Sequence, residues 1–132
     1  MKKILIVDDS PSMRMVLRDI LGQKQKQKQK QKQDEEDYRF FEAGSEEDAL
    51  VQFKKESPDL VLLDIIMPGG DEVGVTVLKK IRAINPKVAV IMISAVGQGP
   101  TIAECAKLGA IDYIVKPFDD MEVLKVVGRS LT

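Results

Sequence analysis

Short apolar runs alternate with amphipathic stretches along nearly the whole chain. Five apolar runs predict strands at residues 3–7, 38–42, 59–64, 88–93 and 111–115. After each run, apolar side chains recur at helical spacing, which predicts helices at residues 11–22, 45–57, 73–84, 101–108 and 119–130. Such alternation is typical of a parallel sheet covered by helices on both faces. We therefore predict an α/β, doubly wound (βα)5 domain with a five-stranded sheet in the order 2-1-3-4-5.

Capping residues support the boundaries of several predicted helices. Ser10 and Pro11 suit the N-cap and the first helical position of the first helix. Ser45, followed three residues later by Asp48, resembles a capping box for the second helix. Gly109 follows the fourth helix, where a glycine commonly ends a helix. The local signals and the apolar periodicity therefore predict the same elements.

One segment has no apolar face. Residues 23–33 alternate Gln and Lys, and residues 34–37 are all acidic. Such a segment cannot be packed into a core, so the favoured interpretation is a solvated, mobile insertion at about residues 23–37 of a single domain that spans residues 1–132. Two alternatives stay open. The first helix continues into the segment as a frayed extension, or the segment is a basic contact arm for an acidic partner, which the neighbouring acidic run makes less favourable.

Composition narrows the class of protein mainly by exclusion. The chain of 132 residues has 20 basic and 21 acidic side chains, and this net charge of −1 argues against binding to nucleic acid or to an anionic membrane. Its apolar runs are too short for a signal peptide or for membrane insertion, and the single cysteine, Cys105, cannot form an internal disulfide. We expect a cytoplasmic protein. Because the chain has no histidine, it cannot use a histidine ligand or a catalytic histidine.

The unusual polar residues follow the predicted strands. They are two carboxylates after the first strand, one after the third, a hydroxyl after the fourth and an ammonium after the fifth, namely Asp8, Asp9, Asp64, Ser94 and Lys116. In open parallel sheets, ligands bind at the carboxyl ends of the strands, so these side chains should converge. Three carboxylates at one place require a cation, and oxygen-only ligation favours Mg²⁺, for which Mn²⁺ could substitute. Phosphoryl transfer to Asp64 is the chemistry that suits this set, with Asp8 and Asp9 at the metal and Lys116 as a cationic clamp.

At this point the sequence resembles response-regulator receiver domains, and among these the stand-alone chemotaxis regulators of the CheY type. Four motifs carry the resemblance, and they are Val7-Asp8-Asp9-Ser10, residues 59–64 with Met67-Pro68, Ser94-Ala95, and Val115-Lys116-Pro117-Phe118. The likeness covers residues 2–131 apart from the Lys-Gln insertion, and it implies a flavodoxin-like fold.

The resemblance implies a role for each matching residue. Asp64 would accept a phosphoryl group from a histidine kinase, and Mg²⁺ would be held by Asp9 and Asp64 directly, by Asp8 mainly through water and by the backbone carbonyl of Ile66. Ser94 and Lys116 would contact phosphoryl oxygens, and the Lys116–Pro117 peptide would be cis. Tyr113 matches the switch aromatic whose ring turns inward when Ser94 moves.

The sequence also departs from the pattern of these relatives. The loop after Met67-Pro68, which continues with residues 69–74, looks about two residues longer than is usual. The resemblance implies that Ile66 and Val96 flank the route that a hydrolytic water would take, and apolar side chains cannot orient a water. We therefore expect slow intrinsic dephosphorylation.

Several functions compete with a signalling switch in chemotaxis. The main alternative is a single-domain phosphorelay intermediate. A Mg²⁺-dependent phosphatase of related topology would usually carry an acid where Ile66 stands, and a flavodoxin-like cofactor binder would not place carboxylates in the loop after the first strand. A degenerate receiver is disfavoured by the complete set of site residues. We expect a monomeric protein that is not an enzyme and that signals by protein–protein contact through the fourth helix, the fifth strand and the fifth helix.

Overall fold

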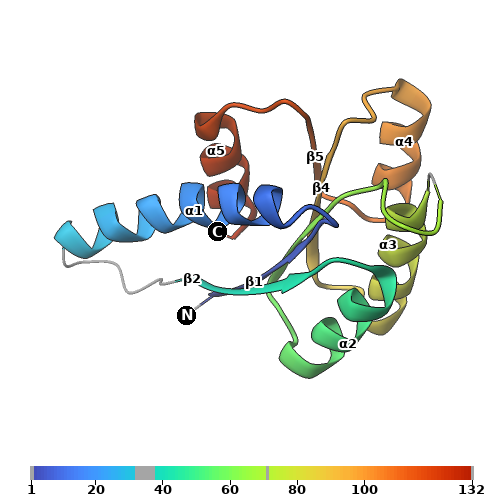
Figure 1. The fold of residues 1–132 in the computed structure, drawn as a ribbon, viewed down its shortest axis with the longest axis horizontal. Helices are drawn as coiled ribbons and strands as arrows, with labels where there is room; N and C mark the ends of the chain where they lie inside the picture. Colours follow the sequence, from blue (N-terminus) through green and yellow to red (C-terminus); the bar gives the residue numbers. More distant parts are fainter. Residues whose placement is uncertain (1, 32–37, 71, 132) are drawn as a thin grey trace.

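The computed structural model describes residues 2–31, 38–70 and 72–131, and for residues 23–31 it describes the backbone alone. Five parallel strands form one sheet in the order β2-β1-β3-β4-β5 (Figure 1). The strands are β1 (Lys2–Val7), β2 (Tyr38–Ala43), β3 (Leu60–Leu63), β4 (Ala89–Ser94) and β5 (Asp112–Val115). The helices are α1 (Pro11–Gln31), α2 (Glu46–Glu56), α3 (Val73–Ile84), α4 (Gly99–Lys107) and α5 (Asp120–Ser130). The predicted (βα)5 order and the predicted strand order are both confirmed.

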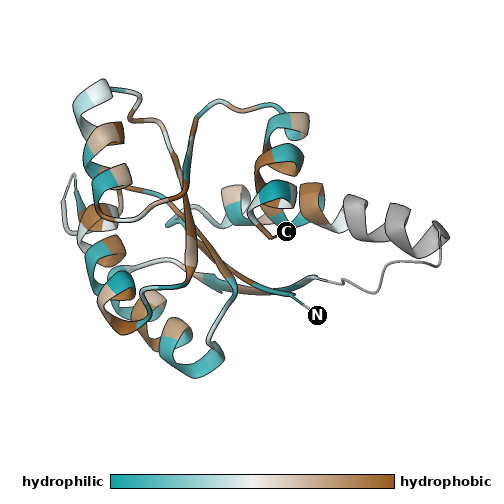
Figure 2. Cartoon of the chain, turned by 180° about the vertical axis from the view of Figure 1, so that it is seen from behind, coloured by the Kyte–Doolittle hydropathy of each residue, from teal (hydrophilic) through white to brown (hydrophobic). Residues whose placement is uncertain are grey.

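Alternate residues of each central strand face opposite layers of helices. Ile4 and Ile6 of β1 join the apolar cluster under α1 and α5, whereas Leu5 and Val7 join the cluster under α2, α3 and α4. All four side chains are at most 1% exposed. This explains why the strands read as continuous apolar runs, because both faces of the sheet are covered. Figure 2 shows the apolar residues concentrated on the strands and on the inner sides of the helices.

The predicted capping residues act at the ends of the helices. The Ser10 hydroxyl oxygen accepts the Met13 N–H at 3.2 Å, and the Ser45 hydroxyl oxygen accepts the Asp48 N–H at the same distance. Gly109 follows α4 with a φ of +104°, a left-handed conformation that glycine adopts without steric penalty. These local bonds fix where the helices start and stop, and therefore how the loops at the site are oriented.

The first helix extends beyond the predicted end at Gly22. Its backbone stays helical to Gln31, so the segment continues α1, as one of the alternatives held, and Figure 1 shows this part projecting past the sheet. Lys and Gln have good helix propensity, which explains a helix without an apolar face. Residues 32–37, the remainder of the expected insertion, lie outside the described residues. Other boundaries shift by one or two positions; α4, for example, starts at Gly99 rather than at residue 101. No described helix combines the length and the apolar character needed to cross a membrane.

Candidate functional site

Three carboxylates meet at the carboxyl-terminal edge of the sheet. Asp8 and Asp9 follow β1, and Asp64 follows β3, the strand paired with β1 in parallel so that Val7 lies opposite Leu63. Each carboxylate offers an oxygen within 4.8 Å of the others. Asp8 and Asp64 are 3% and 7% exposed, whereas Asp9 faces solvent. Sheet topology alone therefore brings the predicted acidic residues together.

Backbone amides hold the two buried carboxylates. One oxygen of Asp8, Oδ1, accepts the Ser10 N–H at 2.9 Å, and Oδ1 of Asp64 accepts the Ile65 N–H at 2.7 Å. Hydrogen bonds of this kind, from a backbone N–H to a carboxylate oxygen, fix the orientation of the side chain. The second oxygen of each side chain is left to face the centre of the site.

Lys116 occupies the position between those second oxygens. Its Nζ donates to Oδ2 of Asp8 at 2.8 Å and to Oδ2 of Asp64 at 3.0 Å. Burial would lower the pKa of the Lys116 ammonium, but the hydrogen bonds and charges of the two carboxylates outweigh burial and raise that pKa above its ordinary value. The Lys116–Pro117 peptide is cis, as the resemblance to receiver domains implied. The lysine therefore holds a fixed positive charge at the acidic cluster.

Ser94 and Tyr113 lie next to one another on the adjacent strands β4 and β5. Ser94 is fully buried, and its hydroxyl oxygen accepts the Val96 N–H at 3.4 Å. The Tyr113 hydroxyl donates to the Val96 carbonyl oxygen. Burial raises the pKa of the Tyr113 hydroxyl, and the nearby Cys105 raises it further, while a hydrogen bond with Ser94 opposes them. The two residues proposed as a switch are thus linked through the loop that contains Val96.

The predicted apolar residues near the acceptor differ in exposure. The side chain of Ile66 is 45% exposed, and Val96 is half-buried. The glycine-rich loop after Met67 folds back on itself, because Met67 and Gly70 form an isolated antiparallel bridge. Gly69 and Gly70 both have positive φ, which explains their use in this turn. Asp71 lies outside the described residues.

Sequence reasoning missed three residues that shape the site. Arg14 donates through Nη1 to the Asp8 carbonyl oxygen at 2.6 Å and through Nε to Glu42 at 2.9 Å. Gly74, in the first turn of α3, packs against the acceptor loop so closely that a Cβ there would lie 2.0 Å from the Asp64 carbonyl oxygen. Arg14 lies on the helix α1 and Glu42 on the strand β2. A charged residue in an amphipathic helix or strand normally indicates a solvated face, so nothing marked either of them. A glycine inside a helix was a signal for Gly74 that could have been followed.

The donor set fits a hard divalent cation. All three side chains offer carboxylate oxygens, and neither nitrogen nor sulfur ligands contribute, which is the chemistry preferred by Mg²⁺. The acidic cluster Asp8, Asp9 and Asp64 is typical of the magnesium site of receiver domains. A carboxylate, a bound cation and an ammonium at one point are also the groups needed to bind and transfer a phosphoryl group.

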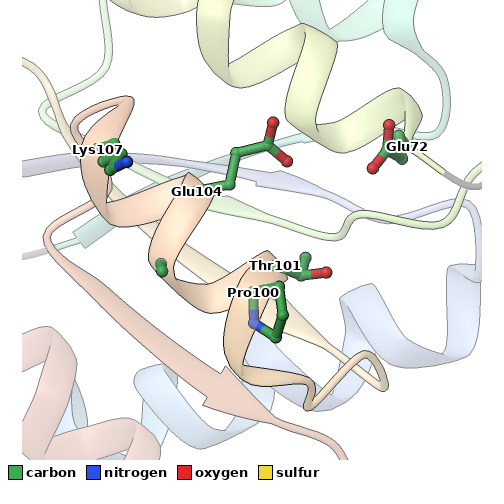
Figure 3. A pocket seen from close by; sticks show the side chains of 6 residues that line it. Glu72, Pro100, Thr101, Glu104 and Lys107 are labelled. Carbon is green, nitrogen blue, oxygen red and sulfur yellow. The ribbon is translucent and has the colours of Figure 1, made fainter.

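A hollow that contains none of these carboxylates lies between the start of α3 and α4 (Figure 3). It is lined by Glu72, Pro100, Thr101, Ala103, Glu104 and Lys107. None of these side chains belongs to the site residues described above.

Comparison with known proteins gives a consistent result. Residues 4–128 match the response regulator receiver domain family. The chain is 40% identical over 129 residues to the chemotaxis protein CheY of Bacillus subtilis, covering 98% of this chain and 97% of that protein. It is 36% identical to sporulation initiation phosphotransferase F of the same organism, covering 98% and 94%. A crystal structure of the CheX-CheY-BeF3-Mg²⁺ complex from Borrelia burgdorferi has a TM-score of 0.84 at 30% identity, covering 99% of this chain and 90% of that one.

Proposed function

We propose that this chain, which belongs to the response regulator receiver family, accepts a phosphoryl group on Asp64 from the phosphohistidine of a histidine kinase. In this step the histidine N–P bond breaks as an Asp64 O–P bond forms, and the phosphoryl oxygens carry their charge into the site. The observation that carries the proposal is the contact of Lys116 Nζ with both Asp8 and Asp64. It places a fixed cation where the transferred group would need one.

Asp8, Asp9 and Asp64 are the side chains that would hold Mg²⁺, with the backbone carbonyl of Ile66 as a further ligand. When bound, the cation would offset negative charge on the phosphoryl oxygens. Mn²⁺ prefers similar oxygen donors and should substitute. The mutual repulsion of three carboxylates supports this assignment, because Lys116 supplies one positive charge against three negative ones.

Ser94, Tyr113 and Lys116 are the residues we propose for sensing the phosphoryl group. Lys116 would exchange its bond to the Asp64 carboxylate for one to a phosphoryl oxygen, and the Ser94 hydroxyl would turn from Val96 toward another. Because Tyr113 and Ser94 both bond to Val96 and its loop, this movement would change the packing of the Tyr113 ring. A local change in charge would thus bias a two-state element.

The chain is not a classical enzyme, and its output is a contact with another protein. We propose α4, β5 and α5 as the contact face. Ile111, Val115 and Met121 on this side of the molecule are between 39% and 62% exposed, which suits an interface that buries apolar side chains. We also propose that the protein is a monomer that neither binds nucleic acid nor inserts into a membrane. We propose a cytoplasmic location, where a histidine kinase would present its phosphohistidine.

Chemotaxis is the process that we propose first, supported by the 40% identity to a CheY protein. A phosphorelay intermediate is the second candidate, supported by the 36% identity to sporulation initiation phosphotransferase F. The two differ in the fate of the phosphoryl group, because a relay protein returns it to a histidine of a phosphotransfer protein. Transfer of the phosphoryl group from the phosphorylated chain to such a partner, without release of free phosphate, would favour the relay.

The test of phosphorylation is the intact mass after incubation with acetyl phosphate, with Mg²⁺ and with a chelator. We expect one phosphoryl adduct that requires Mg²⁺ and is absent from the Asp64→Asn variant. Asp59→Asn, which changes a carboxylate at the opposite end of β3, is the matched control and should still form the adduct. A folded wild-type protein that forms no adduct under any of these conditions would contradict the proposal and favour a degenerate receiver used as a scaffold.

A further inference from the structure

A polar bridge lies behind the acidic cluster, on the side of β2. Arg14 of α1 donates through Nη1 to the Asp8 carbonyl oxygen at 2.6 Å and through Nε to Glu42 Oε1 at 2.9 Å. Glu42 belongs to β2 and pairs in register with Ile6 of β1. The bridge therefore joins α1, the end of β1 and β2, and none of its side chains is one of the three clustered carboxylates.

The guanidinium is fixed from several sides. The second oxygen of Glu42 accepts from Arg18 at 2.6 Å, so both carboxylate oxygens are engaged and the Glu42 side chain has little freedom. Gly44 leaves space for the contact, since a Cβ at that position would lie 3.2 Å from Nη1 of Arg14. Arg14 is 18% exposed, whereas Arg18 is 50% exposed. Arg14 is therefore partly desolvated, which strengthens its charge-assisted hydrogen bonds.

The bonded carbonyl has a special position. It belongs to the peptide unit that joins Asp8 to Asp9, the two neighbouring carboxylates. The Asp8 N–H, which belongs to the preceding peptide unit, donates to the Ala43 carbonyl oxygen at 3.0 Å. With both of its flanking peptide groups bonded, Asp8 has a fixed backbone, and the peptide plane that sets the direction of Asp9 is fixed by Arg14.

We propose that Arg14 is a positioning residue for cation binding, which fixes the Asp8–Asp9 peptide so that both carboxylates face Asp64. This inference rests on the proposed function, because it assigns a role in the same magnesium site. Groups outside the ligand shell typically change metal affinity by about ten- to a hundredfold when they are removed. Arg14 would act at the lower end of that range, because it holds a backbone carbonyl rather than a ligand side chain.

The experiment is a calorimetric Mg²⁺ titration of the full chain, with circular dichroism to confirm that each variant is folded. Arg14→Met should bind Mg²⁺ about tenfold more weakly than the wild type. Arg18→Met is the matched control, because Arg18 contacts the same Glu42 but not Asp8. The Mg²⁺ affinity of Arg18→Met should stay within about twofold of the wild-type value, well below the change expected when an outer-shell partner is removed. Arg14→Lys should lie between them, because one ammonium cannot reproduce the two-pronged contact.

Gly44→Ala keeps Arg14, but its new Cβ crowds Nη1 of Arg14. This variant can be titrated with Mg²⁺ even if Arg14→Met fails to fold. It should weaken Mg²⁺ binding in the same direction. If Arg14→Met binds Mg²⁺ as tightly as Arg18→Met does, the inference is overturned and the proposed function stays intact. If Arg14→Met is unfolded, the same comparison is made between Gly44→Ala and Arg18→Met. A wild-type chain that binds no Mg²⁺ would overturn both.

Discussion

At the scale of single residues, repulsion among the carboxylates of the acidic cluster destabilises the fold, and nearby positive charge offsets this repulsion only in part. Three carboxylates lie within 4.8 Å of one another at their nearest oxygens, and Lys116 supplies one positive charge. Like charges at this distance repel by about 1 kcal/mol in water and by a few kcal/mol in a medium of lower dielectric constant. The site is therefore arranged for a cation at the expense of the stability of the cation-free protein.

Asp9→Asn should stabilise the metal-free chain, because it removes one of three repelling charges at an exposed position. We expect a gain of about 1 kcal/mol in the free energy of unfolding, measured by urea denaturation with a chelator present. The same variant should lose most of the stabilisation that Mg²⁺ gives the wild type. Asp19→Asn, which removes an exposed carboxylate of α1 outside the cluster, should change neither quantity. Destabilisation by Asp9→Asn would show that the carboxylate makes a favourable contact instead.

Hydrolysis of the phosphorylated form should be slow, with a lifetime of minutes or longer. Ile66 is 45% exposed next to the acceptor, so its side chain borders the site without offering a hydrogen bond to water. Ile66→Asn should shorten the lifetime several-fold, because an amide can orient an attacking water. The decay is followed by intact mass after the acetyl phosphate is removed. Ile84→Asn, a change of an exposed isoleucine at the end of α3, should leave the lifetime unchanged. A wild-type lifetime of seconds would be incompatible with this account.

The site residues were predictable because each lies at the end of a strand in a fold that the apolar pattern already indicated. Asp8, Asp64 and Lys116 are such residues, and the structure brings them into direct contact. Arg14 and Glu42 were not predictable in this way. Each is a charged residue in an amphipathic element, and its partner is set by three-dimensional packing between α1 and β2, which no local signal records.

At the scale of elements, the strands and helices were predicted well where apolar periodicity and caps coincide. The predicted range 73–84 is identical to α3, which begins and ends where the pattern does. For α1 the favoured end at Gly22 was wrong, and the alternative that the helix continues into the Lys-Gln segment was right. The backbone stays helical for nine residues beyond Gly22, to Gln31, because Lys and Gln have good helix propensity even without an apolar face. Apolar periodicity indicates which residues of a helix pack against a core. It does not predict how far the helix extends beyond that core.

The contact between α3 and the acceptor loop gives a prediction about Gly74. Gly74→Ala would place a Cβ 2.0 Å from the Asp64 carbonyl oxygen and 2.5 Å from the Ile65 Cα. Backbone atoms at these distances must move, so we expect a loss of about 2–3 kcal/mol in the free energy of unfolding together with weaker Mg²⁺ binding. Gly22→Ala is the matched control, since nothing lies within 4 Å of its Cβ position. It should raise the free energy of unfolding by about 0.5–1 kcal/mol through helix propensity.

The bridge between α1 and β2 gives a pH-dependent prediction. Burial would raise the pKa of Glu42, but its bonds to Arg14 and Arg18 hold the pKa below the ordinary value of 4.5. A carboxyl group with a lowered pKa in the folded state stabilises the fold above its ordinary pKa, and this contribution is lost as the pH falls through the folded value.

Glu42→Gln should therefore be less stable than the wild type at neutral pH, and the difference should shrink as the pH falls below about 4.5. The measurement is urea denaturation of both proteins over a series of acidic pH values. Glu104→Gln, which changes an exposed carboxylate on α4, serves as the control and should show no such convergence. A difference that stays constant across the series would mean that Glu42 contributes by packing and not by charge.

At the scale of the whole molecule, the site exists only when β1, β3, β4 and β5 are assembled side by side in the sheet. Asp8 and Lys116 are 108 positions apart in the chain, yet Nζ and Oδ2 lie 2.8 Å apart. The carboxylates, Ser94 and Lys116 come from the ends of four strands, which the topology aligns at one edge. Because the unfolded chain lacks this site, cation binding and folding are coupled, and Mg²⁺ should raise the free energy of unfolding by RT ln(1 + [Mg²⁺]/Kd).

The central claim is that Asp64 carries the phosphoryl group, and reductive trapping tests it most directly. Borohydride reduces an aspartyl phosphate to the alcohol, so the modified position becomes homoserine and can be located by peptide mass spectrometry after acetyl phosphate and Mg²⁺ treatment. The account predicts homoserine at position 64 and at no other carboxylate. Homoserine at Asp8 or Asp9, or a phosphoryl adduct that resists reduction because it lies on a hydroxyl such as that of Ser94, would contradict it.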